Sequence, residues 1–102
     1  MVLLEFNMSP LDKGESLSQY VSRIIDVIDK SGITYRLTAM GTILEGEYDD
    51  VMAVVRDCFR ELEKDCNRIT VNLKIDYRKG SQSRMNSKIN KIESLLHREI
   101  KK

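Results

Sequence analysis

Alternating apolar and polar positions at the two ends of the folded region predict strands, because successive side chains of a strand point to opposite faces of its sheet. Residues 2–9 carry one apolar row, made of Val2, Leu4, Phe6 and Met8. Leu3, Glu5, Asn7 and Ser9 occupy the other face. Pro10 is expected to end this strand, since proline donates no ladder hydrogen bond. Residues 69–78 alternate in the same way and predict a last strand with one core face.

Apolar residues at helical spacing predict two long helices and a shorter third one. The first is expected to begin at Ser16, with Gln19 as a capping-box partner, and to end at Ser31-Gly32. The second follows the acidic residues 47–50 and is expected to end near residues 64–67. The inward stripes of the three helices are Leu17, Val21, Ile24, Ile25 and Ile28; Val51, Val54, Val55, Cys58 and Leu62; and Met85, Ile89, Ile92 and Leu96.

Residues 35–47, between the two long helices, predict two short strands joined at Met40-Gly41. Gly41 is expected to allow the chain reversal, and Gly46 to end the second strand. The resulting order is strand, helix, strand, strand, helix, strand and an extra helix. It predicts an α+β fold, a ferredoxin-like βαββαβ sandwich with a four-stranded antiparallel sheet and an extra C-terminal helix. Residues 1–102 are expected to form a single domain.

Two helices cover only one face of such a sheet. The second face would carry mixed residues, among them Leu3, Glu5 and Asn7 from the first strand and Asn72, Lys74 and Asp76 from the last. Such a polar face can simply face water, or the last helix or another subunit can cover it. Small domains with open sheet faces and edge strands often self-associate, so a homo-oligomer, dimer or tetramer, is expected.

The amino-acid composition argues against a membrane-spanning, secreted or nucleic-acid-binding protein. With 41% hydrophobic and 32% charged residues, the chain is typical of a globular domain, and no apolar run reaches the roughly 20 residues of a membrane span. The first residues do not form a signal peptide, and two cysteines without metal or redox spacing favour a reduced, cytoplasmic location. From Lys74 onward the sequence contains nine basic residues and three acidic ones. A nucleic-acid surface is nevertheless not expected, because Phe6 and Tyr77 belong to the apolar rows and leave no stacking platform.

Catalysis is not indicated by any motif in the sequence. His97 is the only histidine, and its spacing from Glu93 favours a solvated helical pair. Cys58 belongs to an apolar stripe and Cys66 to a helix end, so an enzyme is not expected, and no cofactor or metal is either. Four polar residues stand out instead: Asn7 and Ser9 at the end of the first strand, and Thr42 and Glu45 in its expected neighbour. They are either ordinary surface residues or a set that converges on a small heterocycle.

The run of residues 35–51 resembles the thiamine-binding protein family of small ferredoxin-like domains, and the segment Met40-Gly41-Thr42 with Glu45-Gly46 is the most specific part. Further similarity lies in Ser9-Pro10, in residues 16–21 and in residues 76–80, so that it extends over residues 4–96. Ala39 stands where many relatives have proline, and Tyr48 where several have tryptophan.

This resemblance implies a cytoplasmic, non-enzymatic protein that binds thiamine or its hydroxymethylpyrimidine moiety. It also implies dimers that pair into tetramers through their sheets. Glu45 could accept a charge-assisted hydrogen bond from the aminopyrimidine, and the thiazolium cation could lie on the aromatic face of Tyr35. The candidate ligand-binding residues are Asn7, Ser9, Tyr35, Thr38, Thr42 and Glu45. If the ligand is phosphorylated, Arg78, Lys79 and the backbone of Gly80-Ser81 are its expected anion partners.

Two other functions stay open. One is a structural or regulatory interaction module that binds another small ligand or a protein partner. The other is a small enzyme with a carboxylate site at Glu45. Multiple turnover abolished by Glu45→Ala would favour the enzyme, whereas saturable binding of a heterocycle without product would favour the binding protein.

Overall fold

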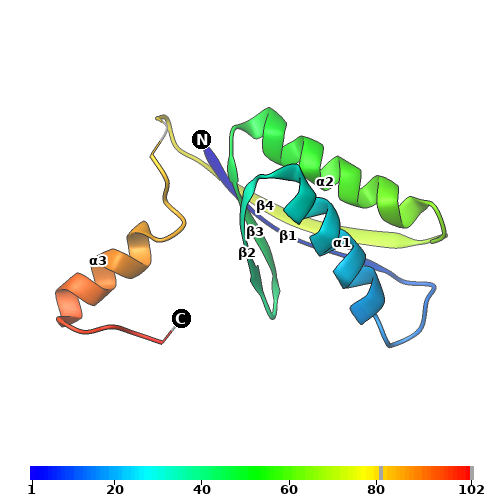
Figure 1. The fold of residues 1–102 in the computed structure, drawn as a ribbon, viewed down its shortest axis with the longest axis horizontal. Helices are drawn as coiled ribbons and strands as arrows, with labels where there is room; N and C mark the ends of the chain where they lie inside the picture. The colour runs from blue at the N-terminus through cyan, green and yellow to red at the C-terminus, as the bar shows by residue number, and fades with distance from the viewer. Residues whose placement is uncertain (81, 102) are drawn as a thin grey trace.

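The computed structural model describes residues 1–80 and 82–101 and confirms the α+β fold expected from the hydrophobic pattern. All strand pairs are antiparallel, and the sheet order is β2-β3-β1-β4. Figure 1 shows the two long helices lying side by side over this sheet. The elements are β1 Val2–Pro10, α1 Ser18–Ser31, β2 Thr34–Thr38, β3 Gly41–Gly46, α2 Tyr48–Glu63, β4 Ile69–Tyr77 and α3 Ser87–Leu96.

The core lies between the sheet and the helices α1 and α2. The apolar row of β1 is buried along its full length, as expected from its alternation. Five predicted stripe positions of α2 are all buried, and α1 contributes Ile24 and Ile28 together with Tyr20. The largest fully buried side chains include Leu4, Leu44 and Leu62, one from each of β1, β3 and α2. Apolar burial on this one face is therefore what holds the two layers together.

Several expected element boundaries were wrong. Pro10 belongs to β1 and pairs with Ile69, and a proline is tolerated there because it is the last residue of the strand. Helix α1 begins at Ser18, two residues later than expected, and its N-cap residue Leu17 makes no side-chain capping hydrogen bond. Its expected end is confirmed, since Gly32 adopts φ 78 and its N–H donates to the carbonyl of Asp29 at 3.3 Å.

The β2–β3 hairpin turns at Ala39-Met40, and Gly41 is the first residue of β3. Gly41 has φ 158, which residues with a side chain rarely adopt, and it also lies very close to a neighbouring strand. A Cβ atom there would lie 2.9 Å from the backbone oxygen of Phe6 on the neighbouring strand β1. Gly41 is therefore constrained both by its backbone conformation beside the turn and by the packing of two strands.

The outer strand β4 is less well covered than its alternation predicted. Leu73 and Tyr77, on the helix-facing side, are 42% and 65% exposed. Ile69, Val71 and Ile75 of the same row are only half-buried. These residues are partly exposed because β4 is an edge strand of the sheet, and α1 and α2 pack mainly over the strands next to it.

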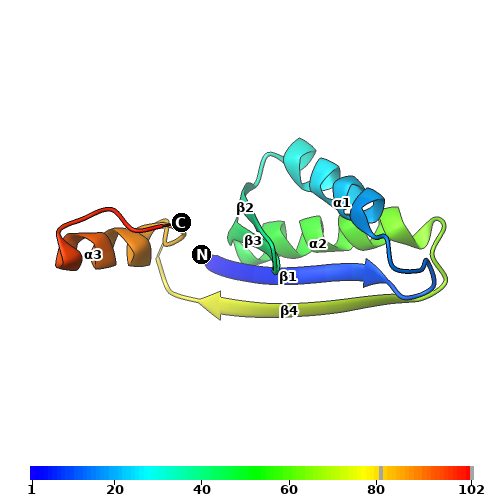
Figure 2. The same ribbon diagram turned by 90° about the horizontal axis from the view of Figure 1, so that it is seen from below.

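The C-terminal helix α3 does not cover the open face of the sheet. Figures 1 and 2 show it standing away from the sandwich, beyond the end of the sheet at which β1 begins. None of its residues is buried. The open face carries the mixed residues that the register predicts, with Glu5 opposite Lys74 and Asn7 opposite Asn72.

Candidate functional site

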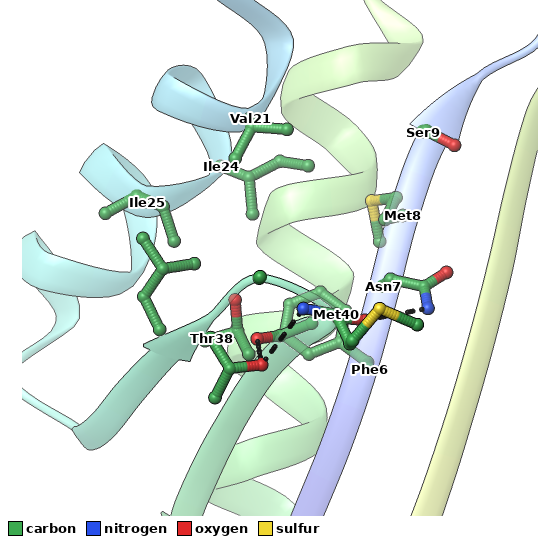
Figure 3. Close-up of a pocket in the computed structure, with 13 residues that line it drawn as sticks. Phe6, Asn7, Met8, Ser9, Val21, Ile24, Ile25, Thr38 and Met40 are labelled. Carbon is green, nitrogen blue, oxygen red and sulfur yellow. Dashed lines mark hydrogen bonds between the residues drawn. The ribbon is translucent and has the colours of Figure 1, made fainter. Parts of the chain in front are cut away.

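A pocket of about 230 Å³ lies between helix α1 and the tip of the β2–β3 hairpin. Figure 3 shows Val21, Ile24 and Ile25 of α1 on one side of this hairpin pocket and Thr38 of the hairpin on another, with the Met40 side chain beside Asn7 of β1. Strand β1 forms the remaining wall. The complete lining consists of Phe6, Asn7, Met8, Ser9, Val21, Ile24, Ile25, Leu37, Thr38, Ala39, Met40, Gly41 and Thr42. The sequence singled out four of these residues as ligand contacts, and the three α1 residues only as core.

Thr42 is the most unusual residue of the hairpin pocket. It lies opposite Phe6 and Leu37 in the sheet register, so its side chain shares the core face of β3 with Leu44. It is only 5% exposed, and within residues 1–80 and 82–101 its hydroxyl has no hydrogen-bond partner. Every fully buried side-chain nitrogen or oxygen of those residues has a hydrogen-bond partner. The Thr42 oxygen must therefore be open to the pocket, where a ligand or a water can satisfy it.

Thr38 builds the mouth of the hairpin pocket. Its hydroxyl donates to the carbonyl of Gly41 at 2.8 Å and accepts from the backbone N–H of Met40 at 3.2 Å. These two bonds fix the conformation of the turn, because the Thr38 hydroxyl satisfies a backbone carbonyl and a backbone N–H of the turn. Met40, at 83% exposed, stands at the entrance. Thr38 therefore positions the entrance and keeps one oxygen lone pair for a ligand.

Asn7 and Ser9 belong to the wall of the pocket through β1, but their side chains point to the other face of the sheet. Figure 3 shows the Ser9 hydroxyl directed away from the isoleucines of α1. The Asn7 amide donates to the carbonyl of Met40 at 3.5 Å, a long and weak bond. These two residues can therefore contact a ligand at the rim of the pocket and not in its interior.

Glu45 lies far from the hairpin pocket, so the four polar residues do not converge on one site. Glu45 and Thr42 are three positions apart on β3, and an odd separation places their side chains on opposite faces. Glu45 pairs with Leu3, at the beginning of β1, whereas Asn7 lies four residues further along that strand. The spacing of about 3.4 Å per residue puts these positions roughly 14 Å apart.

The Glu45 carboxylate is instead held by the chain segment after β4. It accepts hydrogen bonds from the Ser83 hydroxyl at 2.5 Å and from the backbone N–H groups of Arg84 and Met85 at 2.5 and 3.0 Å. Glu45 is 5% exposed. We refer to Glu45 with residues 83–85 as the Glu45 clamp. Sequence analysis did not foresee it, because hydrophobic periodicity says nothing about where a polar loop lies.

Tyr35, Arg78 and Lys79 also lie outside the hairpin pocket. The Tyr35 hydroxyl donates to the carboxylate of Asp29 at 3.1 Å, and this bond raises the pKa of the phenol. Arg78 and Lys79 follow β4 at the end of the sheet that holds Glu45. Ser81, whose backbone was an expected anion partner, lies outside the described residues. The candidate residues thus fall into two groups at opposite ends of the sheet.

Neither cysteine is placed as a reactive thiol. Both are buried and unpaired. Burial raises the pKa of Cys58 to about 12, and burial also raises the pKa of Cys66. Since the thiolate is the nucleophilic form, both groups are in the unreactive state at neutral pH. Among the described residues, no group of histidine, cysteine and carboxylate side chains could hold a metal ion.

Fold and pocket together define a ferredoxin-like α+β domain with a small concave site at one end of its sheet. The sequence matches the family described as thiamine-binding protein over residues 4–93. The match spans most of the chain, and the chain belongs to this family. The resemblance noted in the sequence is thereby confirmed.

Three relatives illustrate the similarity. The UPF0045 protein MJ1052 of Methanocaldococcus jannaschii is 34% identical over 94 residues, which cover 92% of this chain and 94% of that protein. Its crystal structure gives a TM-score of 0.81 and covers 89% of this chain and 94% of that one. The UPF0045 protein Mb1933 of Mycobacterium bovis is 33% identical over 98 residues, covering 95% of this chain and 96% of that protein.

The third relative is a Thermotoga maritima protein, TM0486, described as a candidate thiamine biosynthesis/salvage protein. Its crystal structure gives a TM-score of 0.77 at 27% identity, covering 89% of this chain and 97% of that one. Within the part of this chain that the structure describes, no helix is both long and apolar enough to cross a membrane.

Proposed function

We propose that this protein binds thiamine, or its hydroxymethylpyrimidine moiety, in the hairpin pocket. The observation that carries the proposal is the Thr42 hydroxyl, which has no hydrogen-bond partner among the described residues and belongs to a pocket lined mostly by apolar side chains. A concave apolar site with few polar groups is the usual form of a small-molecule site. Membership of the thiamine-binding protein family gives the class of ligand.

The size of the hairpin pocket favours one part of that ligand. Its volume of about 230 Å³ is below the range of roughly 300–1,000 Å³ that is typical of ligand pockets. One aromatic ring suits this space better than the two linked rings of thiamine. We therefore place the pyrimidine inside, near Thr42, and the thiazolium at the entrance, beside Met40. Asn7, Ser9 and Thr38 would supply polar contacts at the rim.

We further propose that binding is not followed by a reaction. The residues that line the hairpin pocket offer hydroxyl, amide and backbone groups, and they include no carboxylate, imidazole, amine or thiol. General acid–base or nucleophilic catalysis requires such groups within hydrogen-bond reach of the substrate. Glu45, the residue considered for an enzymatic site, is held in the Glu45 clamp at the other end of the sheet.

We also propose that the protein is a homodimer or homotetramer in the cytoplasm. Self-association is supported by the edge strand β4, whose residues Leu73 and Tyr77 expose apolar surface. A reducing location is supported by the free thiols of Cys58 and Cys66. Sedimentation equilibrium at micromolar protein concentration tests the assembly, and a monomer would contradict it.

Calorimetric titration tests the ligand and its place together. Thiamine, hydroxymethylpyrimidine and thiamine phosphate are titrated into the purified protein and into the variants Thr42→Val and Thr34→Val. Thr42→Val keeps the side-chain shape and removes the hydroxyl, so affinity should fall about 2- to 12-fold, as for the loss of one neutral hydrogen bond of ~0.5–1.5 kcal/mol. Thr34 is exposed on β2 and outside the pocket, so its variant is the matched control.

The same titration separates the possible failures. No binding of any of the three compounds by folded protein would contradict the proposed ligand class. Binding that Thr42→Val and Thr34→Val leave equally unchanged would keep the ligand but exclude the hairpin pocket.

A protein-interaction module is the second candidate function, and helix α3 favours it. This helix has no buried residue, and Leu95 and Leu96 expose much of their apolar side chains. An exposed apolar face on an ordered helix is a frequent sign of a protein partner. Co-purification of a specific partner that is lost on removal of residues 87–101, together with no response to the three small molecules, would favour this function.

A further inference from the structure

A basic groove lies at the end of the sheet opposite to the hairpin pocket, between the end of β4 and helix α3. Two adjoining cavities of about 430 and 540 Å³ form it, and both are lined by Arg78, Arg84 and Ser87. Figures 1 and 2 show the chain after β4 leading to α3 at this end of the molecule. The cationic residues of the basic groove are Arg78, Lys79, Arg84, Lys88 and Lys91.

Most of these positive charges have no counter-charge among the residues that the structure describes. Asp76 is the acidic residue in the lining, and Arg84 occupies it, with a 3.1 Å bond to the carboxylate and a 2.9 Å bond to the Asp76 carbonyl. Within residues 1–80 and 82–101, the side chains of Arg78, Lys79, Lys88 and Lys91 form no ion pair. Like charges gathered around a concave surface raise its potential and concentrate anions there.

The walls of the basic groove are held in place by hydrogen bonds to the sheet. The Glu45 clamp fixes the backbone of Arg84 and Met85 to the sheet. The Arg84 side chain is itself only 13% exposed. Arg36 of β2 donates to the Asn86 side chain just before α3 begins. Lys88 and Lys91 are three positions apart on α3, so both lie on the same side of the helix. The cationic groups therefore converge from elements of fixed geometry and not from a loose tail.

We propose that the basic groove is a binding site for a small anion with several negative charges, of the di- or triphosphate class. Four unpaired cations call for more charge than one carboxylate carries, and arginine matches two phosphate oxygens at once while lysine acts as a point charge. The volume of the groove accommodates a diphosphate with an attached group.

A nucleic acid is a poorer occupant of the basic groove. The positive charge is confined to a cavity at one end of the sheet, and it does not continue along the open face, where Glu5 lies beside Lys74. Tyr77, the nearest aromatic residue, lies in the helix-facing row of β4. A strand of nucleic acid needs a track of charge and stacking partners, and this surface provides neither.

The groove does not depend on the proposed thiamine function. Leu3, in its lining, lies roughly 14 Å from Asn7 of the hairpin pocket at about 3.4 Å per residue. The two sites also open on opposite sides of the sheet. Inorganic pyrophosphate contains no heterocycle, so it tests the groove without testing the pocket.

The experiment titrates pyrophosphate into the full-length protein at 50 and 200 mM salt. The groove variant is Lys88→Ala/Lys91→Ala, and Lys30→Ala/Lys64→Ala is the control, because it removes the same charge from exposed sites on and beside α1 and α2. We expect saturable binding that falls roughly tenfold in the groove variant and less than twofold in the control, since only the groove variant removes cations that contact the anion. Thermal melts verify that both variants are folded.

Three results would overturn the proposal. The first is no saturable binding of pyrophosphate at low salt, and the second is an equal loss in both double variants, which would mean attraction by net charge only. The third is a short single-stranded oligonucleotide that binds more tightly than pyrophosphate and gains affinity with length, which would assign the charges to nucleic acid. If the full-length protein binds pyrophosphate but not thiamine, the proposal for the basic groove stands and the proposed function of the hairpin pocket is contradicted.

Discussion

Replacement of Glu45 tests the structural role that the Glu45 clamp assigns to this carboxylate. Glu45→Ala would leave the backbone N–H groups of Arg84 and Met85 without their acceptor. An unsatisfied buried donor costs ~1–3 kcal/mol. The segment 83–85 would therefore undock and let water reach these groups. The stability lost is then limited to the free energy with which the C-terminal segment docks on the sheet. Glu45→Gln keeps one acceptor oxygen and should cost less.

The magnitude can be worked from the three hydrogen bonds. Bonds to a charged acceptor contribute ~1.5–3 kcal/mol each, but they are shared within one small site and are not additive. A net loss of ~2 kcal/mol raises the population of the undocked segment about 30-fold, since ~1.4 kcal/mol is a factor of ten. The strands and the two long helices should remain folded, because the Glu45 clamp lies outside the apolar core.

Limited proteolysis with trypsin reads this population directly. Arg84 is a cleavage site within the Glu45 clamp, and Arg78 and Lys79 are cleavage sites before it. When opening is fast, the cleavage rate follows the open fraction. We expect faster removal of the C-terminal segment in Glu45→Ala, with little change in the far-ultraviolet circular dichroism of the remaining sandwich. Glu5→Ala is the matched control, because Glu5 is an exposed carboxylate on the same open face. Equal cleavage rates in the two variants would refute the reasoning.

Three further predictions concern packing, pH and the exposed helix. Gly41→Ala should lower the free energy of unfolding by ~1–3 kcal/mol in urea titrations, since its Cβ would meet the Phe6 carbonyl at 2.9 Å, whereas Gly46→Ala, with its nearest contact at 3.5 Å, should cost less. Burial raises the pKa of Cys58 to about 12, so the thiol ionises more easily in the unfolded chain, and stability should fall as pH rises above ~9. Cys58→Val should flatten that fall. A pH profile that Cys58→Val leaves unchanged would contradict the role of the Cys58 thiol in this fall. Leu95→Ser should leave the unfolding free energy within ~0.5 kcal/mol, because this side chain is 71% exposed, and a larger loss at fixed protein concentration would show that Leu95 is buried in an assembly.

The sequence was sufficient for the elements that bury one apolar face. The rows of β1 and α2 have a strict period and one buried side, so strand register and helix orientation follow from the pattern. The exposure of Leu73 and Tyr77 could not be deduced in this way. Their spacing is that of a core row, and only the position of β4 at the edge of the sheet explains why the helices leave them uncovered.

The candidate site was only partly accessible from the sequence. Period-two geometry already places Thr42 and Glu45 on opposite faces of β3, so a site on one face can include only one of these two side chains. The Glu45 clamp was out of reach, because Ser83 and the neighbouring backbone donors have no periodic signal. The apolar wall from Val21, Ile24 and Ile25 was also hidden, since a helix stripe that borders a pocket has the same spacing as one that fills a core.

The separation of the two polar ends of the sheet constrains how a phosphorylated ligand could bind. Thr42 and Asn7 lie at the hairpin end, whereas Arg78 and Lys79 lie at the end of the Glu45 clamp, with the sheet between them. One thiamine phosphate in the hairpin pocket of a protomer therefore cannot place its phosphate in the basic groove of that same protomer. If thiamine phosphate binds more tightly than thiamine, and Lys88→Ala/Lys91→Ala removes the difference, the groove must come from a neighbouring subunit. If the difference survives in that variant, the phosphate is bound by groups at the hairpin end, and pocket and groove are independent sites.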